Sequence, residues 1–511
     1  MNPIVAGATV LLGDNLKAGA VQNVTICIPQ SVLNNATQAV TMRLIFTWRN
    51  DQSVGTQPPA AVDNISLVSS GPPSAPAQPT GLALVATSIS QIDGSFTGVA
   101  GAAGYLVVRY PAGATPTAPV DNNAYPVGST LGSGVVIANG AGTTFSADQL
   151  VPNTTYDFYV YAYSGNLCAG PIYSALPPLT GSQTTQACTL LPAGTYTVGP
   201  TGNYTTLGAA MNALTSGVAG NVIFELQPTY TSAGETFPIT IAETPCQFMG
   251  TVVVRPAAGA TNLVITSSAE ATIDFNGGDY VTFDGRPGGV GTAKQLSIIN
   301  TSASGVAIRF RNDAQQNTIT WCDVQGQNTS TASSATTASG VIYFGGSSKP
   351  NAQGNDLNTI SFCDVHATGS GNPAIAISAR GENNTETAYN DSITITDNNI
   401  YDFFIAGSAS TGLKADAGNN AWTVTNNSFY QTAPRTTSAS NTHRAIWITP
   451  NTASIANTAS GFIVTGNYVG GSAPQAGGTP WTMTGAFANV LQALDISVGL
   501  GTPTLVQGNT V

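Results

Sequence analysis

A short motif recurs through the C-terminal part of this 511-residue chain and limits the possible folds more than any other feature. Its first two copies, residues 317–324 and 358–365, read Asn-Thr-Ile-Thr-Trp-Cys-Asp-Val and Asn-Thr-Ile-Ser-Phe-Cys-Asp-Val. The same frame returns at residues 395–400, 424–429, 464–469 and 506–511. The copies lie some tens of residues apart, and self-similarity at such a spacing indicates a solenoid, a propeller or another repeat array.

The intervals between motifs are irregular, and each holds a second short apolar segment, such as Val306–Phe310 or Ala445–Ile448. Two short strands per interval, joined by loops of variable length, predict the coils of a β-solenoid. A sandwich would instead show hairpins with two-residue turns. A propeller would hold a stricter period with four strands per blade, and it is the second choice.

One position in the motif forms a column of its own, two residues before the last apolar residue. If coils stack about 4.8 Å apart, these side chains form a ladder along the solenoid. Asn suits the position because it tolerates a left-handed bend and because its amide can bond to the copies above and below. We therefore interpret the ladder as structural rather than ligand-binding. Its members are Cys322, Cys363, Asn398, Asn427, Asn467 and Asn509.

Two pairs within the first motifs leave alternatives open. Cys322 and Cys363 would lie within disulfide range on adjacent coils, but parallel stacked side chains favour buried free thiols. Asp323 and Asp364 would also stack, either as solvated bend residues, which is the default, or as ligands of a shared calcium ion. Calcium is the one cofactor that these residues leave possible.

Charged residues make up only 8% of the chain, and the formal net charge is −11. Nucleic-acid binding is disfavoured because no basic cluster is present. No apolar run reaches the roughly 18–20 residues of a membrane span. Long surface helices need Glu, Lys and Arg, which are scarce here. An uncharged Thr/Ser/Asn surface on a β-rich protein indicates an extracellular or cell-surface location.

The start of the repeat region also carries a helix signal. Residues 207–214 place Leu207, Ala210, Met211 and Leu214 on one face of a short helix, and strand-like segments follow. This order resembles the entry of right-handed parallel β-helix proteins of the pectate-lyase-like class. The resemblance implies a right-handed parallel β-helix over residues 189–511, closed by an N-terminal capping helix and truncated at its C-terminal end.

Residues 71–188 begin with a Pro-rich linker and carry a second signature. The segment Leu150-Val151-Pro152-Asn153-Thr154-Thr155-Tyr156 resembles the L-x-P-x-x-x-Y corner of fibronectin type III domains. In that corner the tyrosine ring packs inside while its hydroxyl bonds back to the main chain. Phe96 stands where that family usually has a core Trp. A spacer role is expected.

Residues 1–70 predict the C-terminal part of a jelly-roll-like β-sandwich. The ending Ala61-Val62-Asp63-Asn64-Ile65-Ser66-Leu67 resembles the terminal strand of such modules in extracellular proteins. Asp63 is a calcium candidate, although capping of the strand is the preferred interpretation. The N-terminus lacks the basic region of a secretory signal, so we expect flanking segments outside this sequence.

The chain has six cysteines and two histidines, and no CxxC pair occurs. A zinc site is therefore not expected. Cys168 and Cys188 flank a Pro-rich segment and either form a disulfide or stay unpaired.

Enzymes of the pectate-lyase-like class use carboxylates on one face, with calcium and an Arg or Lys base in the lyases and paired Asp residues in the hydrolases. The candidates here are Arg309, Arg311, Asp313 and Asp284. None of them forms a recognisable catalytic pair by spacing, and Asp284 with Arg286 reads most simply as a turn with a local ion pair.

The three-part arrangement resembles large surface proteins that Gram-negative bacteria export by type IX secretion, on phrases such as Thr197-Val198-Gly199-Pro200-Thr201-Gly202-Asn203-Tyr204. The resemblance implies a secreted or cell-surface protein, adhesin-like or structural, whose β-helix binds glycans or other surfaces and which can self-associate. The alternative is a polysaccharide lyase or glycoside hydrolase acting on acidic polysaccharide.

Overall fold

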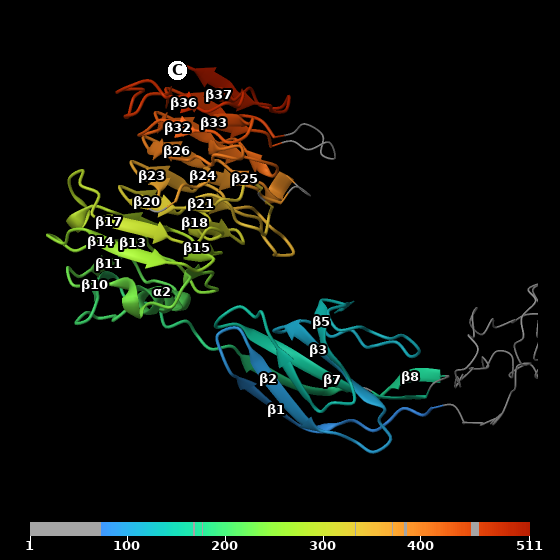
Figure 1. Cartoon of the computed structure of the whole chain (residues 1–511). Helices are drawn as coiled ribbons and strands as arrows, with labels where there is room; N and C mark the ends of the chain where they lie inside the picture. Colours follow the sequence, from blue (N-terminus) through green and yellow to red (C-terminus); the bar gives the residue numbers. More distant parts are fainter. Residues whose placement is uncertain are drawn as a thin grey trace, which may run out of the picture. The chain divides into compact units, whose positions relative to one another are not determined.

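The computed structural model describes residues 73–166, 169–175, 177–332, 334–369, 371–382, 386–450 and 459–511. The predicted jelly-roll-like segment, Asp63 and Cys168 lie outside these ranges. The chain divides into two compact units, residues 1–187 and 188–511, which are described separately. Over these described residues the architecture is all-β apart from one short α-helix and a few 3₁₀ turns (Figure 1).

The first unit contains a sandwich of two antiparallel sheets. One has the order β1-β2-β6, and the other has the order β4-β5-β3-β7-β8, with β9 also paired to β7. The strands are β1 (Thr80–Ala86), β2 (Ile92–Thr97), β3 (Gly104–Pro111), β4 (Thr130–Leu131), β5 (Gly134–Gly140), β6 (Thr144–Ala147), β7 (Thr155–Asn166), β8 (Ala169–Tyr173) and β9 (Leu179–Thr184).

The predicted tyrosine corner is confirmed. The Tyr156 hydroxyl accepts a hydrogen bond from the main-chain N–H of Val151 at 3.0 Å. Phe96 is buried and packs edge-on against Tyr105, with ring centroids 4.9 Å apart. The phenyl ring therefore belongs to the core of this sandwich.

The second unit is a parallel β-helix with three sheets, called here sheets 1, 2 and 3 in the order in which each coil visits them. Every strand pair within these sheets is parallel and joins successive coils. The core is a continuous apolar column that includes Phe283, Ile319 and Ile360 from sheet 1.

Sheet 1 contains β10 (Gly194–Val198), β11 (Val222–Leu226), β13 (Val252–Pro256), β16 (Val281–Asp284), β19 (Thr318–Thr320), β22 (Thr359–Ser361), β26 (Thr394–Thr396), β30 (Thr423–Thr425), β34 (Ile463–Thr465) and β38 (Leu505–Gln507). Sheet 2 contains β14 (Leu263–Ser267), β17 (Leu296–Asn300), β20 (Asp323–Gly326), β23 (Asp364–Ala367), β27 (Asn399–Tyr401), β31 (Ser428–Tyr430) and β35 (Tyr468–Val469). Sheet 3 contains β12 (Ile239–Ala242), β15 (Ala271–Asn276), β18 (Val306–Arg311), β21 (Ile342–Phe344), β24 (Ile375–Ala379), β28 (Thr411–Ala415), β33 (Thr442–Ile448) and β37 (Val490–Ile496). Two short parallel pairs, β25 (Asn390–Asp391) with β29 (Asn419–Asn420) and β32 (Arg435–Thr436) with β36 (Met483–Thr484), lie outside these sheets.

The expectation of two strands per coil is wrong, because a full coil has three. The recurring motif holds two strands, one in sheet 1 and one in sheet 2, separated by a sharp bend. The bend comes from a left-handed residue, Trp321 (φ 53°) or Phe362 (φ 53°) in the first two motifs and Asp397 (φ 56°) in the third. The left-handed residue thus precedes the ladder position, whereas the sequence interpretation had assigned the bend to the ladder residue itself.

The ladder residues lie inside this corner and bond along the helix axis. Asn398 donates from its main-chain N–H (3.0 Å) and its side-chain amide (2.9 Å) to Oδ1 of Asn427. Asn427 and Asn467 donate in the same way to the next coil. Cys322 and Cys363 occupy the first rungs as fully buried free thiols, as expected. Their sulfur atoms contact carbonyl oxygens of the preceding coil, where the asparagines place their amides.

Replacing Asn427 with Ala is expected to lower the free energy of unfolding by about 2–3 kcal/mol. Asn427 is fully buried, and the variant removes the partners of the Asn398 N–H and the Ile395 carbonyl oxygen. Denaturant unfolding measures the change, with the exposed Asn351→Ala as control. An equal, small effect of both variants would contradict a hydrogen-bonded ladder.

The predicted helix is confirmed as α2 (Leu207–Ala213), with Leu207, Ala210, Met211 and Leu214 buried in the β-helix core. It follows β10 and lies at the β10 end of the β-helix (Figure 1). Glu235 accepts hydrogen bonds from the Leu207 and Gly208 main-chain N–H groups, at 2.5 and 2.9 Å. A carboxylate at this position stabilises the helix N-terminus.

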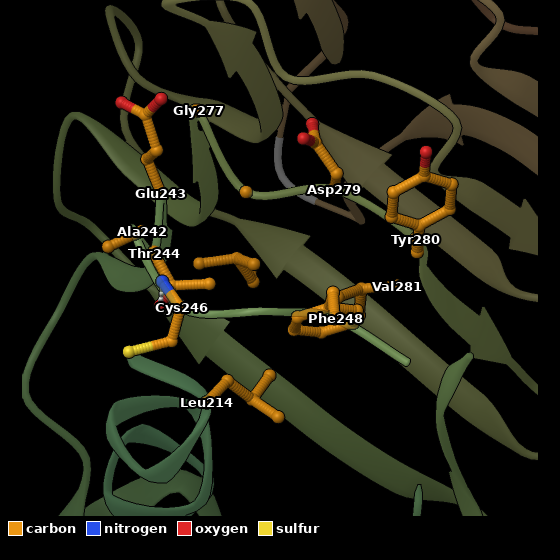
Figure 2. A pocket seen from close by; sticks show the side chains of 12 residues that line it. Leu214, Ala242, Glu243, Thr244, Cys246, Phe248, Gly277, Asp279, Tyr280 and Val281 are labelled. Carbon is orange, nitrogen blue, oxygen red and sulfur yellow. Dashed lines mark hydrogen bonds between the residues drawn. The ribbon is translucent and has the colours of Figure 1, made fainter. Parts of the chain in front are cut away.

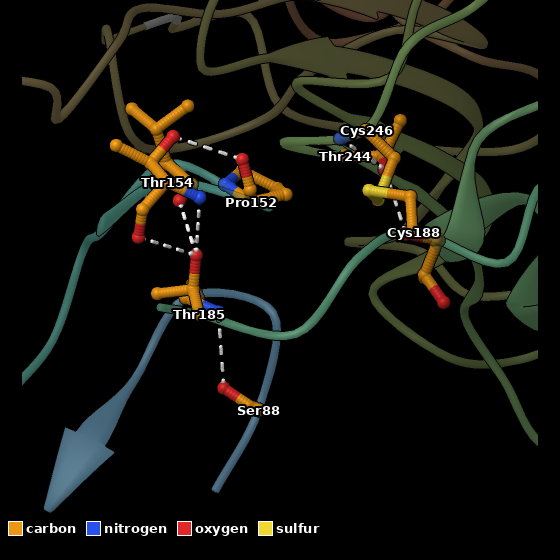
Figure 3. Close-up of a disulfide and its surroundings, with 10 residues drawn as sticks. Ser88, Pro152, Thr154, Thr185, Cys188, Thr244 and Cys246 are labelled. Atoms are coloured by element: carbon orange, nitrogen blue, oxygen red, sulfur yellow. Dashed lines mark hydrogen bonds between the residues drawn. A yellow bond between two sulfur atoms is a disulfide. The ribbon is translucent and has the colours of Figure 1, made fainter. Parts of the chain in front are cut away.

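Next to α2, Cys246 lines a small hollow (Figure 2) and forms a disulfide with Cys188 (Figure 3). Both alternatives for Cys188, a bond to Cys168 or a free thiol, are therefore wrong. The pairing connects residues 58 positions apart and was hidden in the sequence because the turn after β12 has no repeat signature. The bond ties the first residue of the second unit to the turn between β12 and β13.

Candidate functional site

Charged side chains gather on the outer face of sheet 3. Register places Asp274, Arg309, Tyr343, Ser378, Lys414, Trp447 and Asp495 in one outward row. Five of the chain's 14 Lys and Arg residues lie on or next to this face. They are Arg309, Arg311, Arg380, Lys414 and Arg444.

At one end of the face, two arginines hold one buried carboxylate. Arg309 bonds Asp274 through Nε–Oδ1 (2.8 Å) and Nη2–Oδ2 (2.9 Å), and Arg311 bonds it through Nη2–Oδ2 (2.8 Å). Asp274 is 0% exposed. Burial opposes ionisation, but the two arginines prevail and hold the pKa of Asp274 below its usual range. Arg309 also reaches Glu270 at 2.9 Å.

At the other end, three cations surround Trp447 and two carboxylates. Asp416 lies 3.0 Å from Lys414 Nζ and 3.3 Å from Arg380 Nη1. Arg444 bonds Asp495 at 2.6 Å, and its guanidinium lies 4.2 Å from the centroid of the Trp447 ring. The ring also carries Lys414 Nζ at 4.8 Å. The face is therefore a network of ion pairs, in which the carboxylates are bound to arginine or lysine side chains.

The structure brings together only some of the predicted candidates. Arg309 and Arg311 share Asp274, whereas Asp284 forms a bidentate pair with Arg286 in its own turn. Asp313 follows β18 in a left-handed conformation and accepts the main-chain N–H groups of Gln353 and Gly354. These contacts are structural ones, and no catalytic pair forms among the four residues.

Sequence reasoning missed Asp274. The signal was present, because Ile273-Asp274-Phe275 aligns one coil before Ile308-Arg309-Phe310 with the apolar residues inward. This alignment predicts that the residue at the same outward position of the preceding coil, Asp274, is the partner of Arg309.

Asp323 and Asp364 are adjacent on β20 and β23, but each bonds to a different side chain of the protein. His366 Nε2 lies 2.8 Å from Asp323, and Lys294 Nζ lies 2.5 Å from Asp364. The default interpretation as solvated bend residues is wrong, since both are half-buried at the start of sheet 2 strands. Among the described residues, no group of three or more His, Cys, Asp or Glu side chains is placed to hold a metal ion.

A further row of acidic residues, also missed, follows the corner between sheets 3 and 1. Burial is the main cause that raises the pKa of Asp279 to about 6, of Asp356 to about 7 and of Asp391 to about 6. Asp279 and Asp356 each accept a main-chain N–H from the next coil at 2.7 Å. The row therefore supports the stacking of coils at the cost of burying carboxyl groups.

These raised pKa values predict higher stability at pH 5 than at pH 8. A carboxyl whose pKa is raised by folding stabilises the folded state below its unfolded pKa, and this contribution is lost as pH rises through about 6–7. Asp356→Asn, which keeps the acceptor oxygen, is expected to raise stability at pH 8 by about 1 kcal/mol after allowance for solvent screening. Thermal unfolding of both proteins across pH measures this difference in stability. A variant whose stability varies with pH as that of the unaltered chain does would contradict the prediction.

The outer face of sheet 1 has the opposite character. Register aligns two columns of hydroxyl side chains along it, and the residues between them point into the apolar core. One column is Thr282, Thr318, Thr359, Thr394 and Thr423, and the other is Thr320, Ser361, Thr396, Thr425 and Thr465. The members of both columns of this hydroxyl face are uncharged, while Asp284 lies at one end of the face and Asp397 at its border accepts the Thr396 hydroxyl at 2.7 Å.

A pair of aromatic side chains borders the hydroxyl face. The rings of Trp321 and Phe362 stack with centroids 4.7 Å apart and planes at 6°, and the Arg286 guanidinium lies 5.7 Å from the Trp321 centroid. Because the rings stack on each other along the helix axis, they offer edges rather than broad faces to solvent. Stacking also explains how two bulky residues hold a left-handed backbone that rarely suits them.

No family model matches the chain, and none of the curated proteins compared with it does. Among solved structures, that of FN3tt is 17% identical, with 22% of this chain and 97% of that chain covered and a TM-score of 0.16. The surface protein and adhesin PfbA of Streptococcus pneumoniae is 10% identical, with 60% of this chain and 95% of that chain covered and a TM-score of 0.25. A second structure of PfbA is 12% identical, with 52% and 74% covered and a TM-score of 0.23. Structural similarity at these scores does not indicate what this chain binds.

None of the helices among the described residues has the length and apolar character that a membrane crossing requires.

Proposed function

We propose that this chain is an adhesin-like surface protein whose β-helix binds glycans without cleaving them. The observation that carries the proposal is the hydroxyl face of sheet 1. Its threonines present hydroxyl and methyl groups in register, on strands fixed by the core. A preorganised uncharged face of this kind can exchange hydrogen bonds with sugar hydroxyls at little cost in conformational entropy. Export by the type IX route, which the sequence resemblance implies, belongs to the same proposal.

The charged groups of sheet 3 fit a structural role better than a catalytic one. A general base must be free to take a proton. Asp274 instead accepts bonds from two arginines and has a lowered pKa.

The gathering of five cations on this face is the observation that favours the second candidate, a lyase or hydrolase acting on acidic polysaccharide.

A glycan array run beside a depolymerisation assay on acidic polysaccharides tests both candidates. We expect array binding that Thr359→Lys and Thr394→Lys each weaken at least tenfold, because the ammonium group disrupts the hydroxyl face. Thr266→Lys is the matched control, since Thr266 is exposed on β14 of sheet 2. Release of unsaturated or reducing-end products by the unaltered chain would overturn the proposal in favour of the enzyme.

A further inference from the structure

A small hollow lies beside α2. Its volume is about 180 Å³, and it is lined by residues from the turns after β12 and β15 (Figure 2). Leu214, Ile241 and Val281 are buried side chains that make its floor apolar. The Phe248 and Tyr280 rings stack with centroids 6.2 Å apart and form one wall.

Two carboxylates lie on the opposite side of the hollow from Leu214 (Figure 2). Glu243 bonds Lys349 Nζ at 3.0 Å, and the same Nζ lies 3.8 Å from Asp313. Asp279 accepts the Gln315 main-chain N–H at 2.7 Å and has no salt bridge among the described residues. One lysine therefore faces three carboxylates, and the rim of the hollow is anionic.

Glycines keep the hollow open. A Cβ on Gly278 would come 2.4 Å from the Ile241 side chain, and Gly277 has φ +77°, which side-chain-bearing residues rarely adopt. The turn between β15 and β16 thus passes close to β12 without filling the space.

We propose that this hollow binds a small organic ammonium ion, with an apolar body on the Leu214–Ile241–Val281 floor and the ammonium group at Asp279 and Glu243. The lining matches both halves of such a ligand, because apolar and aromatic surface adjoins a group of carboxylates that outnumbers its one lysine. The size fits one small ring, since a cavity of about 150 Å³ lined by apolar residues accommodates benzene. This site is independent of the glycan-binding proposal.

Lys349 is the internal competitor for the rim. Its ammonium group already contacts Glu243, so a ligand cation must share the carboxylates with it. Removing this charge while leaving the floor intact should therefore strengthen binding.

Ligand-observed NMR titration with benzylammonium tests the proposal on the intact chain. We expect a dissociation constant of about 1 mM, as the small number of ligand atoms allows. Benzyl alcohol and methylammonium should each bind at least tenfold more weakly, because one lacks the charge and the other the apolar body. Equal binding of benzyl alcohol and benzylammonium would overturn the proposal without any variant.

Variants then assign the contacts. Asp279→Asn is expected to weaken benzylammonium binding about tenfold, and Lys349→Gln to strengthen it about threefold. Glu270→Gln is the matched control, because Glu270 is an exposed carboxylate just before β15 and does not line the hollow. An Asp279→Asn variant that binds as tightly as the unaltered chain, or a Lys349→Gln variant that binds more weakly, would overturn the proposal. A single cooperative thermal transition in each variant, well above the temperature of the titration, shows that the fold persists.

Affinity should also fall as pH drops from 7.5 to 5, since burial raises the pKa of Asp279 to about 6. The groups that face it are Glu243 after β12, Asp313 after β18 and Lys349 after β21. The Asp279→Asn variant should lose most of this pH dependence, and a retained dependence would count against the proposal.

Discussion

Asp274→Asn is expected to lower the free energy of unfolding by about 3–5 kcal/mol, the cost of leaving a buried ion pair without one partner. The carboxylate is fully buried between Arg309 and Arg311, and its loss leaves Arg309, itself only 8% exposed, with the more exposed Glu270. Denaturant unfolding at pH 7 measures the effect.

The pH profile separates this structural role from a catalytic one. The pKa of Asp274 is lowered by folding, so its contribution to stability is present at neutral pH and is lost as pH falls below its unfolded pKa of about 4. The variant should therefore lose less stability than the unaltered chain on acidification. Asp364→Asn is a matched control at a more exposed ion pair. Unchanged stability combined with lost polysaccharide cleavage would instead make Asp274 part of an active site.

The second large effect concerns the disulfide. Replacing Cys188 and Cys246 together with Ser is expected to destabilise the start of the β-helix by about 4 kcal/mol, the chain-entropy value for a loop of this length. The closed loop of 58 positions contains β10, α2, β11 and β12. Releasing it allows the unfolded chain many more conformations.

Peptide-resolved hydrogen exchange is the appropriate measurement, because long repeat arrays do not always unfold in one step. Exchange should accelerate over residues 194–242 and change little over residues 394–430. Cys322→Ser is a control that alters a buried thiol without opening a loop. Uniform acceleration over the whole unit would show that the coils unfold together and that the disulfide does not protect its own segment.

Much of the β-helix could be predicted because one local motif repeats. The frame around Asn398, Asn427 and Asn467 locates the ladder without any knowledge of the loops. The capping helix was predictable for the same kind of reason, since Leu207 and Leu214 belong to one short periodic segment.

The features that could not be predicted depend on contacts between distant residues, or on backbone conformations that are unusual for the residue type present. Trp and Phe rarely adopt a left-handed backbone conformation, so the sequence at Trp321 and Phe362 does not indicate the bend that divides each motif into two strands. The pairing of Cys188 with Cys246 and the burial of Asp356 arise from the path of the coils. The hollow next to α2 likewise depends on how two turns approach each other, which no local pattern encodes.

The corner between sheets 1 and 2 has a consequence for how such a chain can change. In every copy of the motif one left-handed or glycine residue is followed at once by the ladder residue, although the rest of the coil varies in length. Extra residues can therefore enter at the other corners without disturbing the alignment of coils. An insertion at the ladder corner would move the amide out of reach of its neighbours in both adjacent coils. Loops can thus diversify at the outside of the molecule while this one line of side chains keeps every coil in register.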